Sequence, residues 1–373
     1  MSPTGAPIDG FYSVIPAGGI GSRLWPLSRA DAPKFLHDLT GSGQTLLKDT
    51  WDRLAPLSGP SRIMVVTGRA HRAAVEDQLP DLSDPNVVLE SEPRDSSAAI
   101  GLAAAILVRR EPDVIVGSFA ADHVIRDARG FRRAVQEGVA AARAGFIATI
   151  GITPTEPAIG FGYIHCAGPI AIDGAPNAVA ANSFVEKPDL ATAERYLADG
   201  DYLWNGGMFI ARADVLLRQI GESDPDLLAG IERLADAWDT PARGAVVDKE
   251  WPRLRKIAID YTVAEPAAAA GRLVVIPGDF EWDDVGDFAS IAKLHAGGRK
   301  SDLAILGENA RVLADRSTGI VISQSDRMIS LVGVTDIVVV DTPDALLVTT
   351  TSNAQRVKSV VDALKLSGRD DVL

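Results

Sequence analysis

The sequence is poor in the residues from which disulfide scaffolds and thiolate metal clusters are built. It contains a single cysteine, Cys166, and 5 histidines in 373 residues. One cysteine can form neither an internal disulfide nor a zinc site with several thiolates. This usage is typical of proteins in a reducing compartment, and we expect a cytoplasmic location.

Long apolar runs are also missing. No stretch of about 18 apolar residues occurs, and the first residues lack a basic segment followed by an apolar one, so we expect neither a membrane span nor a secretory signal. The net charge of −13 argues against nucleic acids and anionic membrane surfaces as partners. The hydrophobic content of 46% and the charged content of 23% are typical of a globular protein.

Short β-branched runs alternate with longer segments of helical period between Tyr12 and about Ile276. The pattern predicts strands at 12–17, 63–67, 113–119 and 146–152, and helices at 70–78, 98–110 and 131–144. Such alternation indicates βαβ units. We therefore predict an α/β fold, with a Rossmann-like, mostly parallel sheet flanked by helices, in a domain at residues 1–295.

Residues 296–373 follow a different pattern of apolar and polar residues. Apolar clusters recur about every 8–9 residues, at 320–322, 329–332, 337–340 and 346–348. This spacing predicts a small β module, either a meander or a few coils of a β-helix. Residues 352–366 predict a closing amphipathic helix. Its apolar face would hold Val357, Val360, Val361 and Leu364, with Ser352 or Asn353 as the N-cap.

A glycine-rich segment, PAGGIGSRLWPL, occupies residues 16–27 directly after the first strand. Its glycines let backbone N–H groups approach an anion, and Arg23 can neutralise that anion. The segment lacks the third glycine of a dinucleotide fingerprint, because Leu24 stands there, and the Gly-Lys-Ser/Thr end of a P-loop. It predicts a phosphate-binding loop of another kind, although a tight turn with an incidental arginine is the alternative for such a segment alone.

A second cation, Lys34, follows in Pro33-Lys34-Phe35. A reaction on a triphosphate needs cations at more than one phosphate. Read together, GGIGSRLWPLSR and the following PK resemble the signature of the sugar-phosphate nucleotidylyltransferases, and LWPLSR is similar to the mannose-1-phosphate guanylyltransferases among them. That family usually has a glutamine after the lysine, whereas Phe35 follows Lys34 directly here.

The resemblance implies a nucleotide-diphospho-sugar transferase fold that uses GTP, mannose 1-phosphate and Mg²⁺ to form GDP-mannose and pyrophosphate. It implies catalytic roles for Arg23, Lys34 and Lys187. The segment EPRDSSAAI, which begins at Glu92, is similar to the family's nucleoside-binding segment. The nucleotide-binding residues so implied are Ala17, Gly18, Gly19, Gly21, Ser22, Arg23, Glu92, Asp95, Ser96 and Asp122.

Two aspartates are implied as metal ligands by the same resemblance. Asp122 follows the strand at 113–119, and ligands of open α/β sheets bind at the carboxyl ends of strands. Asp284 lies in WDDVG, which resembles the family's Trp-x-Asp-Val-Gly motif, with Asp283 beside it. Mg²⁺ takes carboxylate and water oxygens. The alternative for Asp122 alone is an ordinary helix cap.

Three further segments resemble the family's sugar-binding elements: IGFGYI at 159–164, FVEKP at 184–188 and WNGGMF at 204–209. Lys187 is implied to face the sugar phosphate, and Glu186 and Asn205 to face sugar hydroxyl groups. The pair Asp260-Tyr261 is a weaker match, which we assign to support. The implied substrate-binding residues are Gly160, Gly162, Tyr163, Glu186, Lys187, Asn205 and Gly207.

Two other functions stay open on the sequence. One is a different sugar-1-phosphate nucleotidylyltransferase, using glucose 1-phosphate or another NTP. The other is a non-catalytic subunit that senses sugar nucleotides, although Arg23, Lys34, Asp122 and Asp284 are all present. The chain is too short for an added isomerase domain, so no isomerase activity is expected. The sequence does not determine the oligomeric state, and a homodimer is the assembly that we consider.

Overall fold

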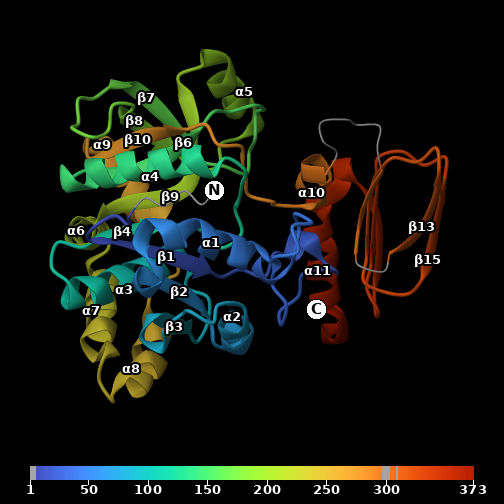
Figure 1. Cartoon of the computed structure of the whole chain (residues 1–373), viewed down its shortest axis with the longest axis horizontal. Coiled ribbons are helices and arrows are strands. Elements are labelled where there is room, and N and C mark those ends of the chain that lie inside the picture. The colour runs from blue at the N-terminus through green and yellow to red at the C-terminus, as the bar shows by residue number, and fades with distance from the viewer. Residues whose placement is uncertain (1–5, 296–302, 308–309) are drawn as a thin grey trace. The chain divides into compact units, whose positions relative to one another are not determined.

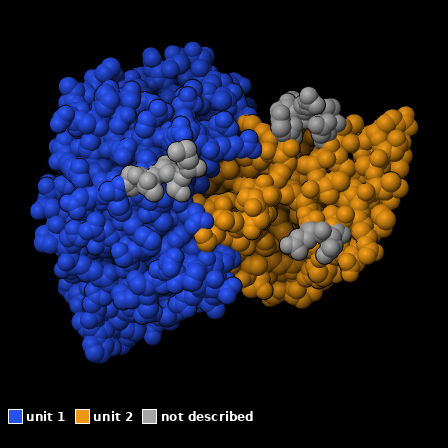
Figure 2. All heavy atoms as spheres, in the orientation of Figure 1, with its two compact units in different colours: residues 1–18, 50–121, 125–282 blue, residues 19–49, 122–124, 283–373 orange. Residues whose placement is uncertain are grey.

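The computed structural model describes residues 6–295, 303–307 and 310–373. The chain forms two compact units (Figure 2). The first comprises residues 1–18, 50–121 and 125–282, and the second comprises residues 19–49, 122–124 and 283–373. Residues 19–49, which carry most of the glycine-rich segment and Lys34, therefore group with the C-terminal part of the chain.

A nine-stranded sheet with the order β3-β2-β1-β4-β9-β6-β10-β8-β7 forms the first unit. Its strands are β1 (Phe11–Ala17), β2 (Ile63–Gly68), β3 (Val87–Glu90), β4 (Ile115–Ser118), β6 (Ile147–Ile152), β7 (Tyr163–Pro169), β8 (Val179–Val185), β9 (Tyr202–Arg212) and β10 (Leu273–Gly278). The strands expected near 12–17, 63–67, 113–119 and 146–152 are all present. They are the apolar, β-branched runs of the sequence, buried on both faces.

The sheet is mixed: most strands share one direction, as expected, but β8 and β9 run against it. Strands β3, β2, β1 and β4 run parallel, and so do β6 and β10. Strand β9 is antiparallel to both β4 and β6, and β8 is antiparallel to β10 and β7. Strands β7 and β8 are joined without a crossover helix and pair in antiparallel fashion. The sequence pattern alone does not reveal this pairing.

Helices cover both faces of this sheet (Figure 1). Gly138 of α4 (Ala128–Arg143) packs closely against Ile210 of β9. The adjacent Phe209 and Ala211 join the core with α3 (Asp95–Arg110), α6 (Ala213–Ser223) and α7 (Pro225–Trp238). Neighbouring strand residues point to opposite faces, so α4 and the group of α3, α6 and α7 lie on opposite sides. The α/β class with flanking helices is thus confirmed.

The helices of this unit are α2 (Arg72–Gln78), α3 (Asp95–Arg110), α4 (Ala128–Arg143), α5 (Leu190–Asp199), α6 (Ala213–Ser223), α7 (Pro225–Trp238), α8 (Arg243–Glu250) and α9 (Glu265–Ala269). Helix α1 (Leu46–Ser58) begins in the second unit and ends in the first. A π-helical turn, Asp260–Ala264, precedes α9. Single π-helical turns are rare in proteins, and those that do occur are often found at functional sites.

The second unit contains a small β-helix. Strands β12 (Leu303–Leu306), β14 (Gly319–Ser323) and β16 (Ile337–Asp341) pair in parallel, as do β13 (Arg311–Asp315) and β15 (Met328–Val332). Strand β17 (Leu346–Thr350) closes the larger sheet in antiparallel pairing with β16. Parallel stacking of successive coils identifies the β-helix among the two expected arrangements. The expected domain boundary lies just after α10 (Phe288–His295), and residues 296–302 lie outside the described residues.

The closing helix is shorter than expected. Residues 351–356 form a 3₁₀ turn, and α11 runs from Val357 to Leu366. Neither Ser352 nor Asn353 caps it, because the N-cap position is Arg356 and no side-chain bond is made there. Val357 and Val361 are buried in the core of this unit, whereas Val360 at the edge of the apolar stripe is 40% exposed.

Candidate active site

The glycine-rich segment needs its glycines for conformation and for space. Gly19 and Gly21 have positive φ values of 83° and 73°, in the region that side chains disfavour. A Cβ on Gly21 would lie 2.8 Å from the Cβ of Lys34 and 3.2 Å from Ser28 Oγ. The close approach of this segment to Lys34 therefore requires glycine at position 21.

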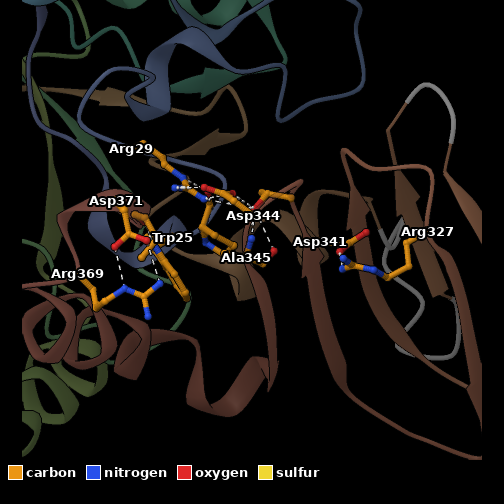
Figure 3. Close-up of polar contacts among 11 residues, drawn as sticks. Trp25, Arg29, Arg327, Asp341, Asp344, Ala345, Arg369 and Asp371 are labelled. Carbon is orange, nitrogen blue, oxygen red and sulfur yellow. Dashed lines mark hydrogen bonds and ion pairs between the residues drawn. The ribbon is translucent and has the colours of Figure 1, made fainter. Parts of the chain in front are cut away.

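The part of the segment that follows is anchored on the C-terminal module, within the second unit. The indole of Trp25 donates to the backbone oxygen of Val372 at 2.7 Å, and Leu24, Trp25 and Leu27 pack in one core with α11. Arg29 binds Asp344 with two hydrogen bonds of 2.9 Å and 2.7 Å (Figure 3). Arg23, in the short 3₁₀ turn Ser22–Leu24, is exposed and makes no ion pair within the described part of the chain.

We expect the chain truncated after Thr351 to melt at a lower temperature and to bind GTP more weakly. The truncation removes α11 and Val372, which cover Leu24 and Trp25 and so hold the turn that carries Arg23. Thermal unfolding and calorimetric titration with GTP measure the two effects. Leu366→Ala is the control, because this side chain is 90% exposed. A truncated protein with unchanged melting and GTP affinity would contradict the anchoring role.

Lys34 lies at the centre of a charged cluster in the second unit. Its Nζ forms an ion pair with Asp122 Oδ2 at 2.8 Å and donates to the backbone oxygens of Asp284 at 2.6 Å and Val285 at 3.2 Å. Lys34 is only 8% exposed. The structure thus brings together Lys34, Asp122 and Asp284, which lie far apart in the chain.

The local backbone holds Asp284 in place. Asp283 Oδ1 accepts a hydrogen bond from the Val285 N–H at 2.7 Å, so the neighbouring carboxylate is used to shape the turn. Val285 is fully buried with φ 47°, an unusual conformation for a β-branched residue. A Cβ on Gly286 would lie 3.3 Å from Asp284 Oδ2. Glycine therefore leaves room beside the Asp284 carboxylate.

The two aspartates have opposite electrostatic environments. Burial raises the pKa of Asp284 to about 6, and Asp283, Asp122 and Asp287 add to this while Lys34 opposes it. For Asp122, burial also acts to raise the pKa, but Lys34 and His123 outweigh it and the pKa lies below its ordinary value. Crowded carboxylates that repel one another favour a bound cation.

The donor set of this cluster fits a magnesium-like ion that is completed by substrate. Among the described residues no group of three or more His, Cys, Asp or Glu side chains is arranged to hold a metal. Asp122 and Asp284 offer carboxylate oxygens only. Mg²⁺ is commonly held by one or two carboxylates together with water and the phosphates of a nucleotide, so two aspartates are sufficient.

The first unit contains a second polar cluster, at the ends of β8 and β9. Lys187 Nζ lies 2.6 Å from Glu186 Oε1. The Glu186 side chain is 8% exposed and that of Lys187 is 61% exposed, so the carboxylate is sheltered and the ammonium is accessible. A Cβ on Gly162 would lie 2.6 Å from Glu186 Oε2, so glycine is needed there for the carboxylate to fit. Gly160 is exposed, with open space around its Cα.

Asn205 is held in one orientation within the same unit. Its Oδ1 accepts from Thr149 Oγ1 at 3.0 Å and from the Gly207 N–H at 3.2 Å, and its Nδ2 donates to Asp260 Oδ1 at 2.8 Å. The amide oxygen is thus already used by two donors. What Asn205 can still offer a ligand is one N–H hydrogen.

Asp260 is a member of this cluster that sequence reasoning assigned only to support. Burial raises its pKa to about 6, and Glu186 adds to the shift. It begins the π-helical turn, and that turn directs its carboxylate to Asn205. The acidic residue before Tyr261 was visible in the sequence, but its approach to a residue 55 positions away was not.

Tyr163 contributes differently from the expectation for a substrate-binding side chain. Its side chain is fully buried and packs against Tyr196 and Trp204, with ring centroids 5.5 Å and 6.5 Å away. The Tyr163 side chain is therefore used in packing against these aromatic rings.

The end of β3 and the segment that follows it contain two glutamates in different environments, Glu90 and Glu92. Glu92, the expected nucleotide contact, has a half-exposed side chain and is paired with Arg94. Trp251 Nε1 donates to the backbone oxygen of Glu92 at 2.8 Å. Both the side chain and the backbone of Glu92 therefore have partners within the protein. Ser96 Oγ accepts from the Ile259 N–H at 2.9 Å, and Asp95 is exposed with φ 67°.

Glu90, which the sequence analysis did not select, is the buried carboxyl of this region. It is 8% exposed, and burial together with Asp95 raises its pKa to about 7. Its Oε2 lies 4.0 Å from the position of a Cβ on Gly18. In β3, Val88 and Glu90 alternate onto one face, and Val88 is a core residue, so the strand pattern carried a signal that Glu90 is buried.

The structure therefore forms two polar groups from the expected residues, one in each unit. Lys34, Asp122 and Asp284 form the first through an ion pair and a backbone hydrogen bond. The second contains the Glu186–Lys187 ion pair and the Asn205–Asp260 hydrogen bond, and charge interactions connect Asp260 with Glu186 and Lys187. Arg23 belongs to neither group. None of the helices described is long and apolar enough to cross a membrane.

Comparison with known proteins identifies the class. The nucleotidyl transferase family matches residues 12–301, and a family described as the MannoseP isomerase/GMP-like beta-helix domain matches residues 310–364. The chain belongs to the nucleotidyl transferase family. The second match agrees with the parallel coils seen after residue 303.

Individual relatives narrow the similarity further. The chain is 36% identical over 365 residues to the mannose-1-phosphate guanylyltransferase of Escherichia coli K12, and 37% identical over 368 residues to the xanthan biosynthesis protein XanB of Xanthomonas campestris. Each match covers 96% of this chain and 74% of the relative. The resemblance to mannose-1-phosphate guanylyltransferases that the signature segments carry is thereby confirmed.

A solved structure shares almost the whole fold. A crystal structure described as mannose-1-phosphate geranyltransferase from Thermus thermophilus superposes with a TM-score of 0.84 at 32% identity. The match covers 95% of this chain and 99% of that protein. The arrangement of an α/β sheet followed by a β-helix is therefore shared along the full length of that protein.

Proposed function

We propose that this chain transfers GMP from GTP to mannose 1-phosphate, giving GDP-mannose and pyrophosphate. The observation that carries the proposal is the cluster of Lys34 with Asp122 and Asp284, which places one cation and two carboxylates beside the glycine-rich signature segment. The names of the mannose-1-phosphate guanylyltransferase relatives support the choice of base and sugar.

The reaction is a direct in-line displacement. A phosphate oxygen of mannose 1-phosphate attacks the α-phosphorus of GTP, the bond to the β-phosphate oxygen breaks, and pyrophosphate leaves with the electron pair. The attacking phosphate is largely a dianion near neutral pH, because its second pKa is about 6. No general base and no covalent enzyme intermediate are needed. The protein's contribution is to position the reactants and to stabilise charge.

We assign the triphosphate to the cations and backbone groups of the signature segment. Gly19 and Gly21 let backbone N–H groups face phosphate oxygens, and the exposed Arg23 is available for the β- and γ-phosphates. Lys34 serves the α-phosphate. Ala17, Gly18 and Ser22 complete the nucleotide-binding segment.

Asp122 and Asp284 are the residues that would hold Mg²⁺. A divalent cation supplies charge neutralisation of the triphosphate and of the leaving pyrophosphate. Asp284 is preferred to Asp283, because Asp283 is already bonded to the backbone of the turn. The raised pKa of Asp284, about 6, is lowered again when a cation is beside it.

The sugar phosphate is assigned to the cluster of the first unit. Lys187 is the accessible cation there and serves the attacking phosphate. Glu186 accepts hydrogen bonds from sugar hydroxyl groups, and Asn205 donates its remaining N–H to one of them. Asp260 fixes the orientation of Asn205. Open space beside Gly160 leaves room for the sugar ring, whereas Gly162 makes room for the Glu186 carboxylate and Gly207 donates its N–H to Asn205.

Guanine is assigned to Glu90 in preference to Glu92. The N1–H and N2–H groups of guanine are adjacent donors, and a carboxylate presents two adjacent acceptors in a matching plane. Glu90 is buried close to Gly18 of the nucleotide-binding segment, whereas Glu92 is paired with Arg94. We assign catalysis to residues 1–295 and support of the signature segment to residues 296–373.

A pyrophosphate-release assay over four NTPs and several hexose 1-phosphates tests this function. We expect GTP with mannose 1-phosphate to give the highest kcat/KM, and activity to require a divalent cation. A preference for glucose 1-phosphate or for another nucleotide would replace the proposed substrates and keep the reaction class. If the protein binds these substrates but turns over no pair of NTP and hexose 1-phosphate, a sensing subunit is favoured.

A further inference from the structure

The Lys34 ammonium group has all of its hydrogen-bonding capacity in use. An ammonium carries three N–H donors. Its three partners are the Asp122 carboxylate at 2.8 Å, the backbone oxygen of Asp284 at 2.6 Å and that of Val285 at 3.2 Å. With 8% of the residue exposed, Lys34 has no hydrogen left to offer a phosphate oxygen in this arrangement.

Two roles therefore compete for one carboxylate. The proposed function assigns Asp122 to a divalent cation and Lys34 to a phosphate, yet Asp122 and Lys34 are bound to each other here. A divalent cation and an ammonium group repel each other at contact distance. Both cannot occupy the same oxygen of Asp122.

The contact with Asp122 is the one of the three that can change. The oxygens of Asp284 and Val285 belong to a turn whose backbone is fixed by the Asp283 hydrogen bond and by the buried Val285 side chain. The Asp122 side chain is 32% exposed. Rotation of the Asp122 side chain can therefore carry its carboxylate away from Nζ while Lys34 keeps both backbone oxygens.

We propose that Lys34 and the divalent cation exchange at Asp122. Without the cation, Lys34 neutralises Asp122. When the cation binds Asp122 and Asp284, one N–H of Lys34 is released and turns to a phosphate oxygen of the nucleotide, and the backbone oxygens of Asp284 and Val285 retain the ammonium group. The inference rests on the proposed function for the assignment of the two metal ligands. It makes Lys34 competent for phosphate only after the cation has bound.

The first test measures binding of Mn²⁺ alone, by electron paramagnetic resonance and without any nucleotide. Lys34→Met removes the competing charge and keeps the length of the side chain, so we expect it to bind Mn²⁺ at least about fivefold more tightly than the wild type. Lys358→Met, an exposed position on α11, is the matched control and should bind as the wild type does. Unchanged or weaker binding by Lys34→Met would overturn the exchange.

The second test follows Lys34 in the wild-type protein, so it does not depend on the folding of the first variant. Limited acetylation with acetic anhydride, read by mass spectrometry of peptides, reports how reactive each lysine is. We expect the reactivity of Lys34 to rise severalfold when Mg²⁺ is added, while that of Lys358 stays constant. Asp122→Asn should give reactive Lys34 with or without Mg²⁺.

An Mg²⁺-independent reactivity of Lys34 in the wild type would show that the lysine does not move, and would end the proposal. Neither measurement contains GTP or a sugar phosphate. The substrate assay can therefore fail while the exchange is found, and the exchange can fail while GDP-mannose is formed. The two hypotheses are thus judged separately.

Discussion

Asp284→Asn should lower kcat by at least about 10²-fold, the loss typical of removing one transition-state stabiliser. The amide keeps the size of the side chain but loses the charge that a divalent cation needs. The measurement is steady-state turnover with GTP, mannose 1-phosphate and Mg²⁺. Asp283→Asn is the matched control, because its remaining oxygen can still accept the Val285 N–H. If Asp283→Asn is the variant that loses turnover, Asp283 rather than Asp284 is the metal ligand.

The same change should stabilise the protein in the absence of metal. The pKa of Asp284 is about 6 in the fold against an ordinary 3.8, so the folded state holds the proton more tightly than the unfolded state does. Ionisation of Asp284 therefore lowers the free energy of unfolding, and this effect is fully present above pH 6. The loss of stability disappears as the pH falls towards 4. Two pKa units correspond to at most about 3 kcal/mol. Denaturation of metal-free wild type and Asp284→Asn at pH 8 and pH 5 should show a larger gain at pH 8 than at pH 5.

A gain in stability together with a loss of turnover has a simple physical origin. Asp284 lies among Asp122, Asp283 and Asp287, and burial disfavours its charge. Such an arrangement costs stability and is compensated when a cation binds. Equal stability of the two proteins at pH 8 without metal would mean that Asp284 is not under electrostatic stress, and the case for a cation there would weaken.

Much of the second unit's cluster could be predicted from the sequence. Lys34, Asp122 and Asp284 each lie in a short motif, and the structure joins them by an ion pair and a backbone hydrogen bond. The glycines of the signature segment could be predicted for the same reason, since a positive φ at Gly19 and Gly21 leaves little choice of residue. Local motifs of this kind carry their conformational requirements within a few residues.

The parts that escaped prediction depend on long-range packing. Antiparallel β9, inserted between β4 and β6, depends on pairings with strands far away in the chain. Asp260 gains its role from a π-helical turn that directs it to Asn205. The anchoring of Trp25 on Val372 joins residues 347 positions apart. No periodicity or short motif contains this information.

The two glutamates at the end of β3 show how a motif can be matched while a neighbouring buried residue is missed. The sequence favours Glu92, because a proline follows it as in the family's segment. In the structure Glu92 is tied to Arg94, and Glu90, two residues earlier on the strand, carries the buried carboxyl. The strand ends at Glu90, so the alternation that buries this residue does not extend to Glu92. We therefore base the proposed guanine contact on burial rather than on the motif.

Glu90→Gln should reduce kcat/KM for GTP by about 10²-fold and leave that for ATP unchanged or raised. A carboxylate accepts both guanine donors, whereas an amide offers one acceptor and one donor, and hydrogen bonds to a charged group contribute about 1.5–3 kcal/mol. Turnover of both nucleotides by each protein gives the comparison. Glu92→Gln is the matched control, and we expect it to stay within a few-fold of the wild type. A large loss in the Glu92 variant with none in the Glu90 variant would return the base contact to Glu92.

The pH dependence of GTP binding provides an independent test of the same residue. Burial and Asp95 raise the pKa of Glu90 to about 7, so the carboxylate is protonated over a range in which an ordinary glutamate is not. Guanine binds the ionised form, hence GTP affinity of the wild type should fall as pH drops below 7, by about tenfold per pH unit once the group is fully protonated. In Glu90→Gln this dependence should disappear, because the amide does not titrate. Calorimetric titration with GTP between pH 5.5 and pH 8 measures the difference, and an unchanged pH profile in the variant would exclude Glu90 as the titrating contact.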